Sequence, residues 1–575
     1  MKRAATVLSL FLCMVTVVFC FAACGKNAVE TTAANDAAEE TTVDETTVDE
    51  TTAAIPTAAA TTDKWEELAP KITVVIPTHR TLRIEMNTWG NATKINRNRE
   101  LVAGPDEVVD GETPVIQQMV YARNRAANEL LETTVEYVFW DDFAWADQAA
   151  EIIKVVNGKA ADAPDLFLDG AYDLTKTLLT TGAFKDLWSI PNSFFDFSTD
   201  GWMSEWMESM SLTGDRAYIL GGDYFVDLIR SISVLPFNMT LMDDNAAKLA
   251  QAILGEGETL GEGEDLSPRF FDLVEEGKWT WDVLGKLCEA IWVDNDGNGQ
   301  DSVEDQLGIL GFTTRAVSSA IYCYSNDEQF FEVKTIEDPN SKYNGKQWVY
   351  YPDSIGSLGE IFDAVAAVYT GHGSLATGGD TAGATPENPG LAYHWIKFGQ
   401  GETLFAGACL LGTMEDEAFQ QMQDLFSVVP TPKVHAETRY NSMIFYDNAD
   451  TGAINVNTHA VKTKVLTAYL QYSVEHSTDI RTELLQTVTK YKTTVYNQGT
   501  DRMLELIYAS VISSRDKVIE YEVGGSVKWN EEMQKGEFVL TSADLAAIYE
   551  ANYRSKQARL DEIIRNWYTY PKVEK

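Results

Sequence analysis

A twelve-residue segment from Asp294 to Asp305 has the spacing of a calcium-binding loop. Such a loop takes oxygen ligands from positions 1, 3, 5, 7, 9 and 12, and it needs glycine at position 6, where the chain turns tightly. Gly299 stands at that sixth position. The pattern therefore predicts a structural Ca²⁺ site, and its expected ligands are Asp294, Asp296, Asn298, the carbonyl of Gln300, Ser302 and Asp305.

The last ligand position departs from the usual pattern, because Asp305 stands where a bidentate glutamate is typical. A shorter side chain must reach further to the ion, so we expect weaker binding than in a standard loop. The alternative is a surface loop rich in Asx turns that holds no ion.

Motifs for catalysis are absent from the sequence. No Gly-x-Ser-x-Gly elbow, His-Glu-x-x-His helix or phosphate-binding glycine loop occurs, and the six histidines show no ligand spacing. Cys288, Cys323 and Cys409 lack metal-type spacing too, and we interpret them as buried small apolar residues. We expect a protein that is not an enzyme and has no catalytic cofactor. Acidic residues are nevertheless so abundant that a glycosidase, which needs a pair of catalytic carboxylates, stays open as an alternative.

Strand-like and helix-like stretches alternate from residue 72 onward. Their apolar periodicity predicts strands at 72–76, 82–86, 135–139 and 166–168, and helices at 114–131, 145–158 and 173–182. Further along, Thr280 is expected to cap a helix that ends at Val293, and a long helical run is expected from Ala543 to Trp567. The alternation predicts an α/β fold with mostly parallel sheets and helices on both faces.

Polar and aromatic side chains follow several of these predicted strands directly. Open α/β sheets bind ligands beyond the carboxyl ends of their strands. Carboxylates and amides there can hydrogen-bond sugar hydroxyls, while aromatic rings stack on the apolar face of a pyranose. The alternative is that Asp169 and Asp173 only cap the next helix and that the aromatic residues are core. The candidate ligand-binding residues are Asn87, Trp89, Trp140, Asp141, Asp142, Asp169 and Tyr172.

The N-terminus has the pattern of a bacterial signal peptide. Lys2 and Arg3 precede an apolar stretch at 7–21, which is followed by Ala22, Ala23 and Cys24. The stretch has about 15 residues, fewer than the roughly 20 that a transmembrane helix needs. The small residues before Cys24 resemble a lipobox, so we expect lipidation of Cys24 after cleavage. The alternative is an ordinary secreted protein in which Cys24 is incidental.

The segment after Cys24 favours anchoring. Residues 27–63 are dominated by Thr, Ala, Glu and Asp, and the unit Thr-Thr-Val-Asp-Glu at 41–45 repeats at 46–50. Such a composition buries too little apolar surface to fold. We expect a disordered tether over 24–64, with a coil dimension on the order of 35 Å.

Length and charge limit the classes of partner. The chain has 575 residues and a net charge of -42. The charge disfavours nucleic acids and anionic membrane surfaces as partners, because both would be repelled. About 510 residues remain after the signal and tether, enough for two or more domains.

The order of local patterns resembles that of family 1 extracellular solute-binding proteins, the lipoprotein receptors of bacterial ABC importers. The similarity covers roughly residues 75 to 560 and depends on the order and spacing of several landmarks. The landmarks are Asn87-Thr88-Trp89, Ala163-Pro164-Asp165-Leu166-Phe167, Leu235-Pro236-Phe237-Asn238-Met239-Thr240-Leu241, Trp279-Thr280-Trp281-Asp282, Phe398-Gly399-Gln400-Gly401-Glu402-Thr403-Leu404-Phe405 and Val428-Val429-Pro430-Thr431-Pro432-Lys433.

The resemblance implies a type II periplasmic-binding-protein-like fold, in which a hinge joins two α/β lobes that enclose the ligand. It adds Tyr322, Tyr324 and Trp395 as second-lobe candidates. The expected division is a signal peptide at 1–23, the tether at 24–64, lobe I at 65–237, lobe II at 238–428, the return of lobe I at 429–480, and a C-terminal helical segment at 481–575 that packs on lobe II and the hinge.

The resemblance also implies the activity. We expect a monomeric receptor, lipid-anchored on the extracellular face of the cell membrane, that captures a small solute, with oligosaccharides as the expected class, and delivers it to ABC permease subunits. Two alternatives stay open: a surface lipoprotein glycoside hydrolase acting on polysaccharide, and a calcium-stabilised adhesion module.

Membrane attachment should depend on Cys24 alone. A Cys24→Ser variant cannot be acylated, and the polar tether offers no other affinity for lipid. Fractionation of cells that express the variant should show release from the membrane or accumulation of uncleaved precursor. Processing and retention like those of the wild type would contradict the lipoprotein interpretation.

Overall fold

The computed structural model describes residues 64–75, 80–87, 100–140, 148–312, 325–328, 332–335, 346–349, 355–377, 393–407, 409–444, 450–490, 498–512, 518, 541–568 and 570. None of the helices in these ranges is long and apolar enough to cross a membrane. Several sequence-based predictions lie outside the described residues: the signal peptide, Cys24, the tether up to residue 63, Trp89, Asp141, Asp142, Tyr322, Cys323 and Tyr324.

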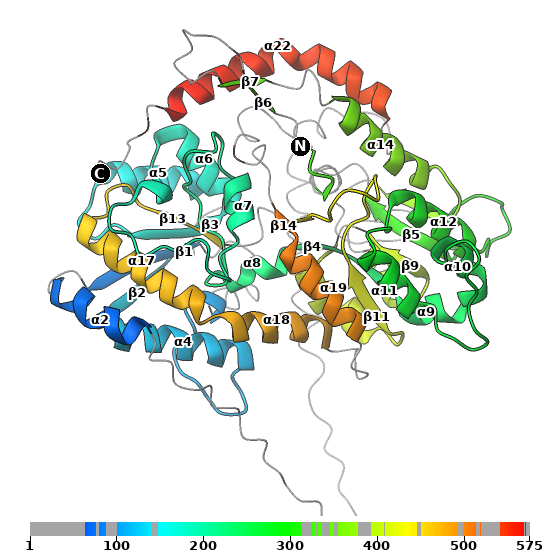
Figure 1. The fold of residues 1–575 in the computed structure, drawn as a ribbon, viewed down its shortest axis with the longest axis horizontal. Helices are drawn as coiled ribbons and strands as arrows, with labels where there is room; N and C mark the ends of the chain where they lie inside the picture. Colours follow the sequence, from blue (N-terminus) through cyan, green and yellow to red (C-terminus); the bar gives the residue numbers. More distant parts are fainter. Residues whose placement is uncertain are drawn as a thin grey trace, which may run out of the picture. The chain divides into compact units, whose positions relative to one another are not determined.

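The first sheet has the strand order β13-β3-β1-β2 (Figure 1). Strands β1 (Thr81–Asn87), β2 (Thr134–Trp140) and β3 (Leu166–Gly170) are parallel, and β13 (Asp450–Ile454) joins β3 antiparallel. Three of the predicted strands are thereby confirmed. The helices between and after these strands are α4 (Val115–Leu131), α5 (Gln148–Gly158) and α6 (Ala171–Thr181), followed by η2 (Leu187–Ser189), α7 (Ser204–Ser209) and α8 (Val226–Arg230).

One strand prediction is wrong, because residues 72–75 belong to helix α2 (Lys64–Val75). The β-branched run that starts at Ile72 has strand propensity, but Trp65, Ala69 and Ile72 are buried at helical spacing. This face packs in the region of α4, and such tertiary packing overrides a weak local preference.

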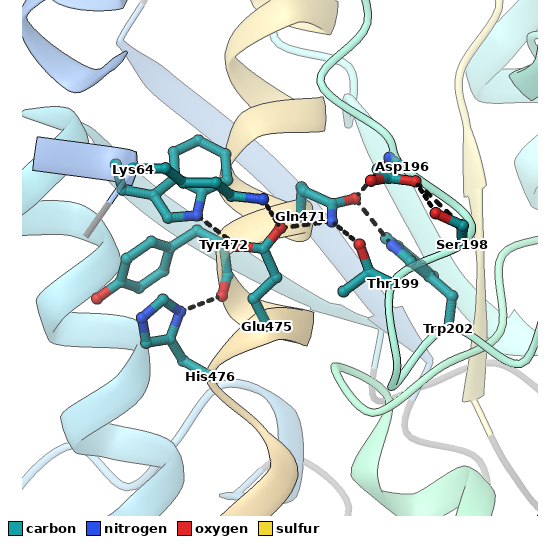
Figure 2. Close-up of polar contacts among 10 residues, drawn as sticks. Lys64, Asp196, Ser198, Thr199, Trp202, Gln471, Tyr472, Glu475 and His476 are labelled. Atoms are coloured by element: carbon teal, nitrogen blue, oxygen red, sulfur yellow. Dashed lines mark hydrogen bonds and ion pairs between the residues drawn. The ribbon is translucent and has the colours of Figure 1, made fainter. Parts of the chain in front are cut away.

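Helix α2 is also tied to helix α17 (Ala460–Glu475) by a single carboxylate, as Figure 2 shows. Glu475 accepts hydrogen bonds from Lys64 Nζ at 2.5 Å, from Trp65 Nε1 at 2.6 Å and from Gln471 Nε2 at 2.7 Å. Gln471 Oε1 in turn accepts from the indole of Trp202 at 2.9 Å. The first described residues of the chain are therefore fixed to the helices of the first sheet.

The second sheet is mixed, with the order β10-β4-β9-β5-β8 and with β11 also paired to β4. Strand β5 (Leu307–Phe312) is parallel to β8 (Ser374–Thr377) and β9 (Thr403–Ala406), whereas β4 (Ser233–Asn238) is antiparallel to its neighbours. The other elements of this part are β10 (Cys409–Leu410), β11 (Phe426–Val429), α9 (Met239–Asp244), α10 (Ala246–Ile253), α11 (Ser267–Glu275), α12 (Trp281–Ile291), α14 (Ile355–Tyr369), α15 (Tyr393–Gly399), η3 (Leu411–Glu415), α16 (Glu417–Gln421) and the hairpin of β6 (Glu332–Thr335) and β7 (Lys346–Val349).

Side-chain caps and aromatic packing hold this second part together. The hydroxyl of Thr280 accepts a hydrogen bond from Val283 N and caps α12, as predicted, although the helix ends at Ile291 rather than at Val293. Trp279 stacks on Phe405 with 5.5 Å between ring centroids, and its indole donates to the carbonyl of Pro430. The start of α12 is thereby fixed to the core of the sheet.

The chain passes between the two sheets at buried serines. Strand β4 leaves the region of the first sheet, and β12 (Ser442–Met443) precedes the return to β13. Strand β14 (Val511–Ile512) pairs with β12 in parallel. Ser233 Oγ accepts from Met443 N at 3.0 Å, and the hydroxyls of Ser442 and Ser510 lie 3.0 Å apart. Three passages of the chain thus lie side by side, while the predicted domain limits stay predictions.

A buried ion pair joins the same regions through helices α18 (Thr478–Lys490) and α19 (Gln498–Ala509). Asp223 accepts from Arg481 Nη1 at 2.8 Å and from the hydroxyl of Tyr508 at 2.6 Å. Burial raises the pKa of Asp223 to about 6, and Arg481 and Tyr508 counteract this effect. Because α19 packs on β11, the pair links a loop of the first-sheet region to the second sheet.

The C-terminal helix α22 (Ser542–Trp567) confirms the predicted helical run from Ala543 to Trp567. It contacts α14 and β7, and it also contacts α6 of the first-sheet region (Figure 1). The helix therefore touches elements on both sides of the crossing strands.

Replacing Gly308 should test the close approach of β5 to α12. A Cβ atom at Gly308 would lie 2.2 Å from the Cα atom of Cys288, so Gly308→Ala forces the backbones apart. We expect a loss of about 1 to 3 kcal/mol in the free energy of unfolding, measured with denaturant. Gly356→Ala is the matched control, because no atom lies within 4 Å of that added methyl group. Equal stability of the two variants would contradict this packing.

Candidate functional site

The carboxyl ends of three parallel strands meet at one edge of the first sheet. The Cα atom of Asn87 pairs with that of Trp140, and Met86 pairs with Leu168. Continued by one residue, the second register sets Asp169 beside Asn87. Three of the predicted ligand-binding residues, Asn87, Trp140 and Asp169, thus occupy neighbouring strand ends.

Trp140 is half-buried at this edge and meets Phe167 in an edge-to-face contact, with 6.3 Å between ring centroids. Phe167 is fully buried. One side of the indole is therefore part of the core, as the alternative interpretation of the aromatic residues expected. The exposed remainder offers an apolar surface at the end of the strands.

Asp169 is 1% exposed, and its Oδ1 accepts a hydrogen bond from Gly170 N at 2.7 Å. It does not cap helix α6, because the N-cap residue is Gly170 and no side chain caps that end. Asp173, predicted as the helix start, lies at the third residue of α6 and is not the cap either. Tyr172 is half-buried in the first turn.

Two acidic residues at the same edge are not among the predicted candidates. Glu85 is fully buried in β1 and precedes Asn87 by two residues, so both positions belong to one face of the strand. Asp450 pairs with Gly170 on the antiparallel strand β13. Strand β1 alternates polar and apolar residues, and Glu85 falls on the polar face with Arg83, so no local pattern marks its burial. The rule that ligands bind at the carboxyl ends of parallel strands does not apply to Asp450, because Asp450 is the first residue of an antiparallel strand.

The carboxyl groups of Glu85 and Asp169 are both buried at this edge. Carboxylates accept hydrogen bonds and repel anions, so hydroxyl groups and cations are the compatible ligand groups. Together with the indole of Trp140, the edge offers acceptors beside an apolar ring. This combination suits a neutral polyol or sugar better than an anionic ligand.

Of the three ligand-binding candidates predicted in the second lobe, the structure describes Trp395, which is half-buried in α15. Its ring lies 5.3 Å from that of His394, a buried histidine whose pKa burial lowers to about 3. The cysteine interpretation is confirmed for Cys288 and Cys409, which are free and buried. Burial raises the pKa of Cys288 to about 12, so its thiol is not a nucleophile near neutral pH.

The calcium-type loop connects α12 to β5. Oxygen atoms of Asp294, Asp296 and Asp305 all lie within 4.8 Å of one another. Asp294 accepts from Gly297 N at 2.6 Å and from Gly299 N at 2.9 Å. Burial acts to raise the pKa of Asp294, but these N–H groups outweigh it and lower the pKa.

Gly299 has φ +73°, the left-handed conformation that the sixth position of the motif needs. Asp305 is 1% exposed, and its two oxygens accept from Asn295 N at 2.8 Å and from Ser302 N at 2.9 Å. These bonds close the loop through protein groups. The remaining predicted ligands Asn298, Gln300 and Ser302 lie in the same turn.

No protein-family model and no curated protein matches the chain. Solved structures do match. The GacH receptor of Streptomyces glaucescens GLA.O, solved unliganded and with acarbose, matches 83% of this chain and 98% of its own at 11% identity and TM-score 0.43. The galacto-N-biose-/lacto-N-biose I-binding protein of the ABC transporter from Bifidobacterium longum matches 85% and 97% at 12% identity and TM-score 0.41. A family 1 extracellular solute-binding protein from Bifidobacterium longum subsp. infantis matches 84% and 99% at 11% identity and TM-score 0.42.

Chelation should decide between an ion site and a plain turn at the loop 294–305. An ion bound only to the folded state adds RT ln(1 + [L]/Kd), about 2.7 kcal/mol at a hundredfold excess over Kd. We therefore expect EGTA to lower the melting temperature of the wild type. The double variant Asp294→Ala with Asp296→Ala should melt lower and lose the response to EGTA. Equal wild-type melting curves with calcium and with EGTA would mean that the motif is only a turn.

Proposed function

We propose that this chain is a tethered, extracellular solute-binding receptor that captures a small neutral solute, with oligosaccharides as the expected class, for an ABC importer. The observation that carries the proposal is the edge of the first sheet, where the indole of Trp140 and the buried carboxylate of Asp169 lie at the ends of the two parallel strands that flank β1. The order of landmarks in the sequence supports the same class of protein.

The chemistry of capture follows from these groups. Hydroxyls of a sugar donate to carboxylate acceptors, and the aromatic ring contributes apolar contact without requiring charge on the ligand. The net charge of -42 also disfavours anionic solutes, because the field of the whole protein repels them.

Hinge closure is the proposed mechanism. Ligand contacts from both sheet regions exist only when the regions are together, so a ligand shifts the population toward that state. The passages at Ser233, Ser442 and Ser510 are the segments about which such a movement would turn. The proposal includes no catalytic step.

Attachment and metal binding complete the proposal. Lipidated Cys24 would hold the chain at the membrane, and permease subunits would receive the solute from the monomeric receptor. A calcium ion in the loop 294–305 would tie the end of α12 to β5 as a structural element. Extracellular calcium is plentiful enough to fill a site weakened by Asp305.

A thermal-shift screen should identify the ligand, because binding to the folded state alone raises apparent stability. Acarbose, tagatose, lacto-N-biose and ribitol, with which similar structures were solved, start the panel. With a confirmed ligand, we expect Trp140→Ala and Trp89→Ala to weaken binding by about 1 to 3 kcal/mol in calorimetry, and Tyr172→Ala to weaken it less.

Trp188→Ala is the control variant, since Trp188 is 38% exposed and belongs to η2 rather than to a strand of the first sheet. Its affinity should equal that of the wild type. Unchanged affinity in the three test variants would mean that these three side chains do not contact the ligand. A complete panel without any thermal shift would argue against the receptor itself.

A further inference from the structure

The two ends of helix α22 are attached to different sheet regions. Its last two turns bury apolar side chains, and Trp567 is 1% exposed. The indole of Trp567 donates to Thr213 Oγ1 at 3.0 Å, and Arg216 Nη1 donates to the carbonyl of Trp567 at 3.1 Å. Tyr218 meets the same indole edge-to-face at 5.0 Å. The buried apolar residues of this end are Leu560, Ile563, Ile564 and Trp567.

The partners of this C-terminal end belong to the first sheet. The hydroxyl of Tyr570 donates to the carbonyl of Leu179 at 2.6 Å, at the end of α6, which follows β3. Leu220, close to Thr213 and Arg216 in the chain, pairs with Gly452 of β13. The C-terminal end of α22 is therefore built into the first-sheet region by both apolar burial and hydrogen bonds.

The N-terminal end of α22 is attached to α14. Ser542 N donates to Asp363 Oδ1 at 2.8 Å, and Leu545 is the buried apolar residue of the first turn. Thr541 and Asp544 form a capping box within the helix itself. Helix α14 packs on α12 and β8, so this end belongs to the second-sheet region.

The two ends of α22 differ in how many apolar side chains they bury, and the helix between them is long. At about 1.5 Å per residue, its 26 residues span roughly 39 Å as one stiff element. A change in the angle between the sheet regions must break or shear one attachment, because packed contacts have discrete arrangements. At the first turn of α22, Leu545 is buried and Ser542 N is bonded to α14, and the helix also contacts α14 and β7. Four apolar side chains are buried in the last two turns, so we expect the first turn to give way first.

We propose that α22 is a strap, fixed to the first-sheet region at its C-terminal end, whose N-terminal end leaves α14 when the two regions separate and docks again when they come together. Docking adds contacts to the closed arrangement only, so the strap favours closure. The strap movement rests on the hinge movement of the proposed function, and its link to capture rests in addition on the solute.

Hydrogen exchange of the ligand-free full chain tests the strap directly. We expect amides of 545–549 to exchange at least about tenfold faster than amides of 560–567 in the same helix, since local opening follows local stability. Residues 542–544 are left out of the comparison, because the first N–H groups of any helix lack an intrahelical partner. Equal exchange at both ends would overturn the proposal, because the helix would then open or detach as one unit.

A matched pair of variants on α14 tests where the release occurs. A Cβ atom at Gly359 would lie 2.9 Å from Ser542 Cβ, whereas one at Gly356 meets nothing within 4 Å. Gly359→Leu should raise exchange at 545–549 and leave 560–567 unchanged, and Gly356→Leu should do neither. Loss of protection along the whole of α22 in Gly359→Leu would overturn the proposal.

Exchange of α14 itself serves as the internal check on folding. If Gly359→Leu also speeds exchange at residues 362–369, the variant has disturbed α14 itself. The site of release is then tested by comparing Asp363→Ala with Asp363→Asn, because only asparagine keeps an acceptor for Ser542 N. The alanine variant should release 545–549, and equal behaviour of both variants would contradict release at this contact.

A ligand confirmed by thermal shift provides the last measurement. It should slow exchange at 545–549 and leave 560–567 unchanged. A ligand that binds without this effect would show that docking of the strap is not coupled to solute binding. The ligand-free comparisons would still decide whether the strap moves.

Discussion

Close packing of three chain passages at Ser233, Ser442 and Ser510 is the constraint on which the arrangement of both sheets depends. The three side chains are small and buried, and their hydroxyls pair with one another or with backbone N–H groups. Ser442 N also donates to the carbonyl of Ser510 at 2.8 Å. Buried backbone groups must be paired, so the sheets are joined by a hydrogen-bonded ribbon. Larger side chains at these positions would separate the passages and unpair them.

Buried carboxylates organise the loops near both candidate sites. Asp169 accepts the N–H of the residue that precedes α6, and Asp305 accepts two N–H groups across its loop. Each carboxylate therefore already shapes the local backbone. A sugar hydroxyl or a calcium ion would bind to oxygen atoms whose positions the protein has fixed in advance, which limits the ordering that binding requires.

The sequence predicted most of the first sheet, because strands such as Leu166–Gly170 are apolar runs with clear limits and α6 ends at a glycine. The run Ile72–Val75 was misassigned, since its helical face is visible only with Trp65 and Ala69 included. Two acidic residues of the edge escaped prediction for different reasons. Glu85 lies inside a strand, and Asp450 is brought to the edge only by antiparallel pairing with β3, which depends on the return of the chain from the second sheet. Long-range pairing of this kind leaves no local signal.

The hydrogen bonds that Glu475 accepts from Lys64 and Trp65 affect how the protein would meet a partner in the same membrane. If the chain is anchored at Cys24 through the tether that its composition predicts, that tether joins the folded body where the carboxylate of Glu475 holds the first turn of α2. The attachment point on the folded body is then constant. A short flexible linker gives a local concentration on the order of millimolar for a partner in the same membrane. An importer could therefore engage this protein repeatedly through a surface of low intrinsic affinity, and always from the same attachment point.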